Sequence, residues 1–160
     1  MTKGTGESKT YYKTEIGFVV IQGTEAGISY INFVDEEKVQ EDPGEKSAVL
    51  TEGVRQLDEY FKGKRKEFSL KLRPAGTNFQ QRAWRELQKI PYGETISYGQ
   101  QAERMGNIKA CRAVGGANGK NPLSIVIPCH RVIGKDGSLT GFGSGTWRKK
   151  WLLNHEKKFK

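Results

Sequence analysis

The chain has 160 residues, of which 35% are hydrophobic and 28% charged; this composition excludes a disordered or fibrous protein and fits one domain or two small ones. No apolar run is long enough to cross a bilayer and residues 1–10 are too polar for a secretory signal, so we expect a cytoplasmic protein that does not bind membranes. The formal net charge is +9, and the whole basic surplus lies in the second half of the chain.

Residues 1–76 are predicted to form a small α/β unit. Residues 17–22 and 27–33 are rich in β-branched and aromatic side chains, which predicts two strands joined by a short turn. After an acidic loop with Pro43 and Gly44, apolar residues at helical spacing predict a helix that ends at Gly63. These apolar residues are Leu50, Val54, Leu57 and Phe61.

A third strand is predicted just before the end of this unit. Phe68, Leu70 and Leu72 alternate with polar residues, as in a strand with one face in water. Residues 74–76 (PAG) break the pattern. We place the boundary between two domains, 1–76 and 77–160, at this point.

The second half is predicted to be mainly helical. Thr77 and Gln80 have the spacing of a capping box, and an apolar stripe behind them predicts a helix that ends before residues 91–93. Ser97 and Gln100 begin a second helix in the same way. The stripe of the first of these helices consists of Phe79, Ala83, Trp84, Leu87 and Ile90.

The next two helices have the arrangement of a helix-turn-helix. The helix that begins at Ser97 is short and stops near Gly106, and a further helix is predicted to begin at Ile108. This further helix is expected to place Ile108, Cys111 and Gly115 on one face and Lys109, Arg112 and Gly116 on the other. Small residues beside basic ones favour close approach to DNA, although an ordinary packing helix remains an alternative. Cys111 is expected to be a small buried core residue.

The charge distribution agrees with a nucleic-acid partner. Residues 1–76 contain 12 Lys or Arg and 13 Asp or Glu, a net charge of −1. Residues 77–160 contain 15 and 5, a net charge of +10. A one-sided excess of this kind is typical of proteins that bind DNA or RNA, while a solubilising surface with a lysine-rich tail is the alternative.

The segment around Cys129 carries the clearest chemical signal. Three β-branched residues, 125–127, predict a buried extended segment that turns at Pro128. A thiol is a nucleophile only as thiolate, and a free cysteine titrates near ~8.5, so a nearby base or positive charge is needed. His130 supplies an imidazole. Because adjacent residues of an extended chain point to opposite sides, its contact with Cys129, direct or through water, requires a turn.

This segment, IVIPCHRVIG at 125–134, closely resembles the active-site signature of O6-alkylguanine-DNA alkyltransferases, the single-use repair proteins for alkylated guanine. The resemblance covers the C-terminal half strongly and the N-terminal half in layout only. It implies an α/β (α+β) fold, with a small sheet-plus-helix, ribonuclease H-like domain followed by a mainly helical domain with a helix-turn-helix. Four other segments match the family in order and spacing: 93–98 (GETISY), 112–122 (RAVGGANGKNP), 140–142 (TGF) and 151–156 (WLLNHE).

The resemblance implies the chemical roles of four residues. Cys129 is the nucleophile and alkyl acceptor. His130 draws the thiol proton through a water molecule, and Glu156 orients and polarises His130, as in other Cys–His–carboxylate relays. Tyr98 donates a proton or a hydrogen bond to the guanine as it leaves.

The resemblance also implies how DNA is held. Arg112 fills the gap left by the extruded nucleotide, since the target atom is unreachable inside the base stack. Asn121 holds the turn between the DNA-binding helices and the cysteine segment. Phe142, where many relatives have Tyr, forms the lid of the base pocket with Gly143, Ser144 and Gly145. The expected DNA-binding residues are Tyr98, Gly99, Asn107, Arg112 and Lys135.

The implied function is repair by direct reversal. An alkyl group passes stoichiometrically and irreversibly from O6 of guanine in double-stranded DNA to Cys129, with O4 of thymine as an expected second source. We expect a monomer that needs no cofactor. Some members of the family bind zinc in the N-terminal half; we expect no such metal here, because the Cys and His residues, 111, 129, 130 and 155, all lie in the second half.

Three alternatives remain at this point. A lesion-recognition protein without transfer would lack a cysteine at position 129. A helix-turn-helix regulator would need a dimer interface and a base-reading helix, and gives no reason for the cysteine segment. A cysteine hydrolase would turn over its substrate instead of saturating at one equivalent.

Overall fold

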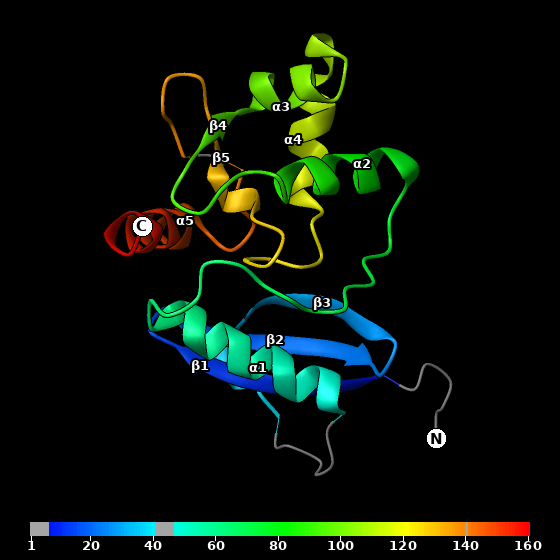
Figure 1. Ribbon diagram of the computed structural model, residues 1–160, viewed down its shortest axis with the longest axis vertical. Coiled ribbons are helices and arrows are strands. Elements are labelled where there is room, and N and C mark those ends of the chain that lie inside the picture. Colours follow the sequence, from blue (N-terminus) through cyan, green and yellow to red (C-terminus); the bar gives the residue numbers. More distant parts are fainter. Residues whose placement is uncertain (1–6, 41–46, 140) are drawn as a thin grey trace. The chain divides into compact units, whose positions relative to one another are not determined.

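A computed structural model of the chain describes residues 7–40, 47–139 and 141–160. The predicted loop at Pro43 and Gly44 lies outside the described residues, as does Thr140. The chain divides into two compact units, Met1–Pro74 and Ala75–Lys160, and each is described by itself. The mixed α/β fold is confirmed, with a small sheet in the first unit and mainly helices in the second (Figure 1). None of the helices in these residues is long and apolar enough to span a membrane.

The first unit is a three-stranded antiparallel sheet, in the order β1-β2-β3, with a helix packed on it (Figure 1). Its elements are β1 (Ser8–Thr14), β2 (Gly17–Thr24), β3 (Gly27–Val34), a 3-10 helix (Glu36–Lys38) and α1 (Ala48–Phe61). The two strands and the helix expected from the sequence are present. The sequence analysis missed β1, which is a mostly polar edge strand; Tyr12 in it donates a hydrogen bond to Asp58 of α1 (2.7 Å).

The predicted strand at residues 68–72 is wrong. Leu72 forms a single isolated bridge with Ile28, and no ladder extends from it within the described part of the chain. Ser69 explains why, because its backbone pairs with a side chain instead of a strand. Its N–H donates to Oε1 of Gln56 (2.9 Å), and its carbonyl accepts from Nε2 of Gln56 (3.2 Å).

The second unit contains the helices that the capping signals predict. Both capping boxes form: Thr77 with Gln80, and Ser97 with Gln100. Each box satisfies backbone donors at a helix start, so it fixes where the helix begins. The elements of the unit are α2 (Asn78–Leu87), β4 (Ile96–Ser97), α3 (Tyr98–Arg104), α4 (Cys111–Gly119), β5 (Val132–Ile133) and α5 (Thr146–Lys158), with 3-10 helices at Ile108–Ala110 and Cys129–Arg131.

The start and the faces of the third helix in this unit differ from the prediction. A 3-10 turn occupies Ile108–Ala110, where the Asn107 side chain accepts a hydrogen bond from the Lys109 N–H (3.0 Å), and α4 begins at Cys111. This turn changes the phase of the helix. Ile108 is 64% exposed and Cys111 is exposed, so the prediction that Cys111 belongs to the core is wrong. The buried residues of α4 are Val114, Ala117 and Asn118.

Buried polar contacts hold α2, α3 and α4 together. Gln101 on α3 and Asn118 on α4 form two reciprocal amide hydrogen bonds (2.8 and 3.0 Å), and both side chains are buried. Nε1 of Trp84 on α2 donates to the carbonyl of Ala117 (2.9 Å). Because an unpaired buried amide costs about 1–3 kcal/mol, these contacts favour one angle between the helices that carry the DNA-binding candidates.

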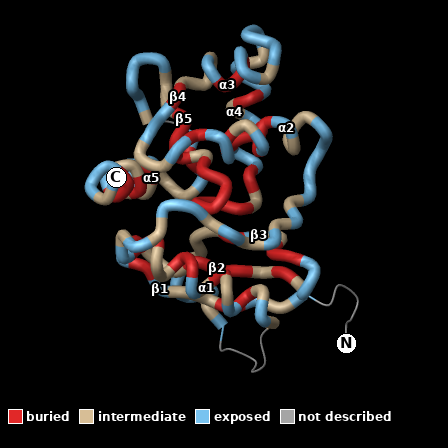
Figure 2. The backbone as a smooth tube through the Cα atoms, viewed as in Figure 1, coloured by how far each residue is buried: buried red, intermediate tan, exposed pale blue. Residues whose placement is uncertain are grey.

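The segment before Cys129 is buried, as predicted, but it is not extended. Figure 2 shows the buried chain in this part of the second unit. Ile127 donates from its N–H to the carbonyl of Leu123 (2.9 Å), and Ile125 has a positive φ of 76°. The chain therefore turns before it reaches Pro128, and residues 129–131 follow as a 3-10 helix.

Candidate active site and DNA-binding surface

Cys129 is the first residue of the 3-10 helix and is half-buried. Asn121 holds the turn in front of it: its Nδ2 donates to the carbonyl of Ile127 (2.8 Å), and its Oδ1 accepts from the N–H of Leu123 (2.9 Å). The Asn121 side chain also hydrogen-bonds the Cys129 thiol. The buried Asn121 amide thus holds the backbone turn before Cys129 and also contacts the thiol of Cys129.

His130, Arg131 and Glu156 form a buried network beside the cysteine. Nε2 of His130 lies 2.7 Å from Oε2 of Glu156, and both side chains are fully buried. Arg131 donates to the same carboxylate from Nε (2.8 Å) and Nη2 (3.0 Å), and from Nη1 to the carbonyl of Ile90 (2.7 Å). The N–H of Gly93 donates to Oε1 of Glu156 (3.1 Å). Every oxygen of this carboxylate is therefore held in place.

The electrostatics of the network define the protonation of His130. Burial by itself would raise the pKa of Glu156, but the charges and hydrogen bonds of His130 and Arg131 outweigh it and hold that pKa well below its usual range. Burial lowers the pKa of His130, although Glu156 opposes this shift. At neutral pH His130 is thus a neutral imidazole whose Nε2–H donates to Glu156. Its Nδ1 is then an acceptor, and this buried atom has no hydrogen-bond partner among the described residues.

Burial raises the pKa of the Cys129 thiol, while the hydrogen bond from Asn121 and the positive charge of Lys149 act in the opposite direction. Between Cys129 and His130 the described residues show no direct hydrogen bond. A thiol in this environment is mostly protonated at neutral pH, so it needs a base to become a nucleophile.

Tyr98 and Lys149 lie together at this site. Nζ of Lys149, on α5, is 5.7 Å from the centre of the Tyr98 ring, at the start of α3. Lys149 is only 1% exposed, and burial lowers its pKa, while Cys129 raises it. A Cβ atom at Gly141 would come within 2.9 Å of the Tyr98 hydroxyl, and one at Gly115 within 3.9 Å of its ring. Tyr98 is therefore enclosed by glycines from two segments and by a buried cation.

Gly141 lies beside the Tyr98 hydroxyl, and the segment after it connects to the start of α5 at Thr146. Phe142 is 8% exposed, Gly143 is exposed and Ser144 is half-buried. The aromatic ring at position 142 therefore points into the unit, while the two small residues that follow it reach the surface. This is the segment that the family resemblance identifies as the lid of the base pocket.

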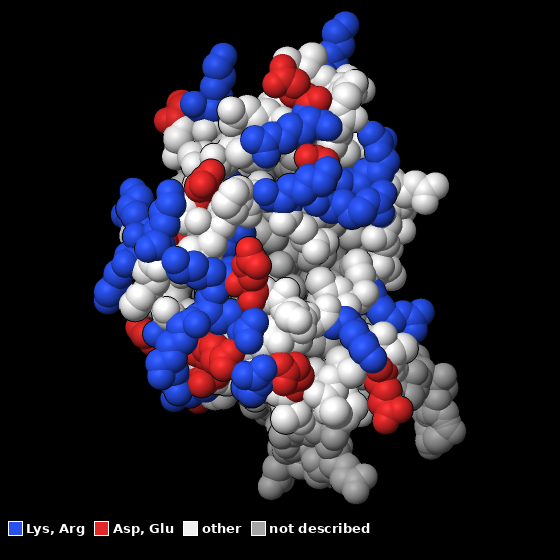
Figure 3. All heavy atoms as spheres, in the orientation of Figure 1, with Lys and Arg blue, Asp and Glu red and all other residues white. Residues whose placement is uncertain are grey.

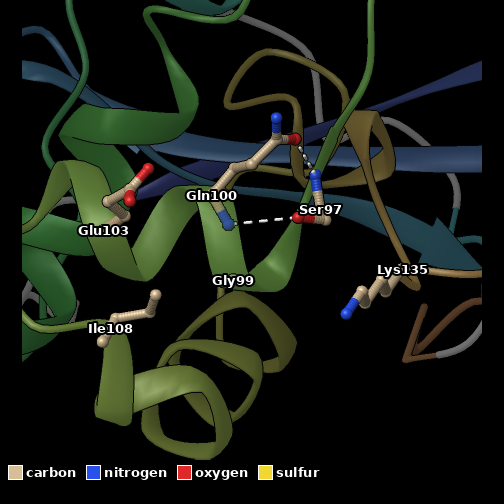
Figure 4. A pocket seen from close by; sticks show the side chains of 6 residues that line it. All are labelled: Ser97, Gly99, Gln100, Glu103, Ile108 and Lys135. Carbon is tan, nitrogen blue, oxygen red and sulfur yellow. Dashed lines mark hydrogen bonds between the residues drawn. The ribbon is translucent and has the colours of Figure 1, made fainter.

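Two of the expected DNA contacts line one surface depression of about 500 Å³ (Figure 4). Gly99 is at its floor on α3, and Lys135 reaches in from the loop after β5. Exposed Ile108 and the acidic Glu103 also line it, so its walls are mixed in character.

Among the described residues no contact joins Arg112 or Asn107 to the cluster around Cys129. Arg112 is exposed on the first turn of α4, with no ion pair among the described residues. Asn107 is exposed, and its side-chain oxygen caps the 3-10 turn. Figure 3 shows Lys and Arg side chains over much of the second unit on the face in view, with fewer Asp and Glu. The helix-turn-helix thus presents exposed cations such as Arg112, while Tyr98 at the start of α3 belongs to the catalytic site.

Sequence reasoning missed two residues of the site. Arg131 was noted as part of the motif but was given no role, and Lys149 was not singled out. A lysine in a basic helix gives no sign that it is buried, so Lys149 has no signal in the sequence. The described residues contain no group of three or more His, Cys, Asp and Glu that could hold a metal ion; that the protein needs neither metal nor cofactor remains a prediction.

Comparison with known proteins covers both units. Residues 78–158 match the family model for the DNA binding domain of 6-O-methylguanine DNA methyltransferase, and residues 8–74 match that for its ribonuclease-like domain. The methylated-DNA–protein-cysteine methyltransferase of Methanosarcina acetivorans is 47% identical over 148 residues, which are 91% of this chain and 95% of the relative.

Solved structures give the same result. The O6-methylguanine methyltransferase of Mycobacterium tuberculosis is 40% identical and superimposes with a TM-score of 0.85 over 96% of this chain and 94% of that one. The M. tuberculosis protein in complex with DNA is 42% identical, with a TM-score of 0.83 over 93% of this chain and 92% of that one.

Proposed function

The chain belongs to the 6-O-methylguanine DNA methyltransferase family, and from that premise we propose that it repairs DNA by moving an alkyl group from O6 of guanine to its own Cys129. The observation that carries the proposal is the buried His130–Glu156–Arg131 network next to a half-buried thiol. We propose double-stranded DNA with alkylated guanine as the partner, a monomeric state and a cytoplasmic location. O4-alkylthymine is a second proposed substrate.

The first step is removal of the thiol proton. The proton of Cys129 passes through a water molecule to Nδ1 of His130, the acceptor that Glu156 leaves available by binding Nε2. The resulting imidazolium is stabilised by the Glu156 carboxylate. Arg131 holds that carboxylate in place and keeps it ionised, so it acts as a positioning residue. Lys149 and Asn121 favour the thiolate directly.

The second step is displacement at the alkyl carbon. The thiolate forms a carbon–sulfur bond while the carbon–O6 bond breaks, and the electron pair of that bond stays on the guanine. Tyr98 donates a hydrogen bond or its proton to the base, which lowers the charge that develops on it. The product on Cys129 is a thioether. Because a thioether has no readily hydrolysed bond, each protein molecule acts once.

DNA is proposed to lie across the helix-turn-helix. Gly99 and Lys135 would contact the sugar-phosphate backbone at the depression they line, with Asn107 beside them. Arg112 would enter the duplex and occupy the space left by the extruded nucleotide. Phe142, Gly143 and Ser144 would close over the base next to Tyr98.

Reaction stoichiometry tests this function directly. The protein is mixed with a large excess of duplex that contains O6-methylguanine, and repaired guanine is counted after nuclease digestion. We expect guanine to stop accumulating at one equivalent per protein, and a Cys129→Ser variant to bind the duplex but repair none. Continued turnover would indicate a hydrolase, and binding without repair by the wild-type protein would indicate a lesion-recognition protein.

A further inference from the structure

The loop that leads into α5 is fastened by two neighbouring side chains. We call residues 141–145 the lid loop. Nη1 of Arg148 donates to the carbonyl of Ser144 in this loop (2.9 Å), and the Arg148 guanidinium carbon lies 4.5 Å from the centre of the Trp147 ring. The two side chains thus form one unit, which we call the clasp.

The Trp147 half of the clasp lies against the lid loop itself. A Cβ atom at Gly145 would come within 3.2 Å of both Cδ1 and Nε1 of the Trp147 indole, and Gly145 has a φ of +104°. Glycine adopts this backbone conformation without strain, whereas a Cβ at this position would be strained and would also require the indole to shift by a few tenths of an ångström. Gly145 also donates its N–H to the carbonyl of Phe142 (3.0 Å), which closes the loop on itself.

The first residue of the lid loop and the helix that follows the loop both lie beside Tyr98. At the first end, Gly141 faces the Tyr98 hydroxyl so closely that a Cβ atom would lie 2.9 Å from it. Past the other end, Lys149, the residue after Arg148, places Nζ 5.7 Å from the Tyr98 ring. The clasp therefore lies between two contacts with Tyr98, the group that is proposed to contact the substrate.

The Trp147 side chain is unusual for its exposure. It is 56% exposed, although a ring of this size is ordinarily highly buried, and it lies in the first turn of α5, directly after the lid loop. The contact with the Arg148 guanidinium favours one position of this exposed indole, by about 0.5–1 kcal/mol. Under the proposed function the lid loop covers the base, so an adduct larger than a methyl group requires the loop to move, and the clasp opposes that movement.

We propose that Trp147 and Arg148 set the size of the alkyl group that the site accepts, by holding the lid loop closed at its edge. This inference rests on the proposed function, because it concerns the selectivity of the same site. Neither residue touches the reacting atoms, so both are positioning residues. The clasp is expected to affect transfer of a bulky group while it leaves methyl transfer almost unchanged.

The test compares second-order rate constants for two duplexes, one with O6-methylguanine and one with O6-benzylguanine at the same position. The variants are Trp147→Ala and Arg148→Ala, with Trp147→Phe as the conservative replacement. Lys150→Ala is the charge-matched control, since Lys150 is an exposed cation on the same helix. Thermal unfolding and DNA affinity are measured for each variant.

We expect Trp147→Ala and Arg148→Ala to raise the ratio of benzyl to methyl rate constants by roughly two- to fivefold, the effect of losing one exposed cation–π contact. Trp147→Phe and Lys150→Ala should keep the wild-type ratio. An unchanged ratio in both alanine variants overturns the inference, and so does a parallel fall in both rate constants, which would show a merely structural role. If the wild-type protein transfers neither group, the proposed function itself fails.

Discussion

The Glu156→Gln substitution tests the buried network most severely. The carboxylate is fully buried and accepts hydrogen bonds from Gly93, His130 and twice from Arg131. The glutamine side chain has nearly the same volume as glutamate, but it has no charge. One of the two accepting oxygens also becomes an NH2 group, which faces the N–H donors of the neighbouring residues. Arg131, which is 6% exposed, is left buried without its counter-ion.

Loss of one partner from a buried ion pair costs about 3–5 kcal/mol. A domain of this size has a free energy of unfolding of about 5–15 kcal/mol, so Glu156→Gln should remove a large part of it. Lys89→Gln is the control, because it removes an exposed pair with Glu86 (3.0 Å) in the same unit and should cost at most ~1 kcal/mol.

Urea unfolding, followed by tryptophan fluorescence, gives the free energy of unfolding of the wild-type protein and of both variants. The three tryptophans, Trp84, Trp147 and Trp151, all lie in the second unit, so the signal reports on the part of the chain that contains the network. A Glu156→Gln protein whose free energy of unfolding stays within ~1 kcal/mol of the wild-type value would refute the claim that this network is a tightly paired, desolvated ion pair.

Three further predictions concern chemistry, DNA and pH. Tyr98→Phe should slow methyl transfer roughly 10²-fold in single-turnover experiments, with DNA affinity nearly unchanged, because one donor to the leaving base is lost; equal rates would remove Tyr98 from the mechanism. Arg112→Ala should slow repair in duplex DNA by roughly tenfold but leave the reaction with free O6-benzylguanine unaffected, since the free base needs no extrusion; an equal loss with both substrates would contradict the role. The pKa values of His130 and Glu156 are both lowered by folding, so the unfolded chain binds more protons. Stability should therefore fall as the pH drops below 6.5, when His130 titrates in the unfolded chain, and further below 4.5, when Glu156 does; unfolding curves that do not change from pH 7 to pH 4 would contradict both shifts.

The local signals in the sequence were sufficient for most of the fold. The capping boxes at Thr77 and Ser97 fix helix starts through contacts between residues three apart, and such contacts are legible in one chain. The edge strand β1 has no comparable signal, since its register is set by pairing with β2. The expected strand at residues 68–72 failed because Gln56, distant in sequence, pairs with its backbone.

Some features of the candidate site could also be predicted from the sequence, and others could not. The nucleophile and the histidine stand next to each other in the chain, and family resemblance supplied Glu156. The turn that positions Cys129 and His130 includes Ile125, which has a positive φ. Positive φ is rare for a β-branched residue, so nothing in the sequence gives reason to expect a turn here. The exposure of Cys111 follows from the 3-10 turn that precedes α4, and the burial of Lys149 from the tertiary packing of α5, so periodicity could not reveal either.

Peptide mass spectrometry after reaction with a duplex containing O6-methylguanine tests the central claim most directly. The chain supplies its own control, because Cys111 is an exposed thiol in the same unit while Cys129 is half-buried. The account predicts one added methyl group per protein, located on Cys129, with Cys111 unmodified. A methyl group on Cys111, or no modification of Cys129 although the lesion is bound, would contradict it.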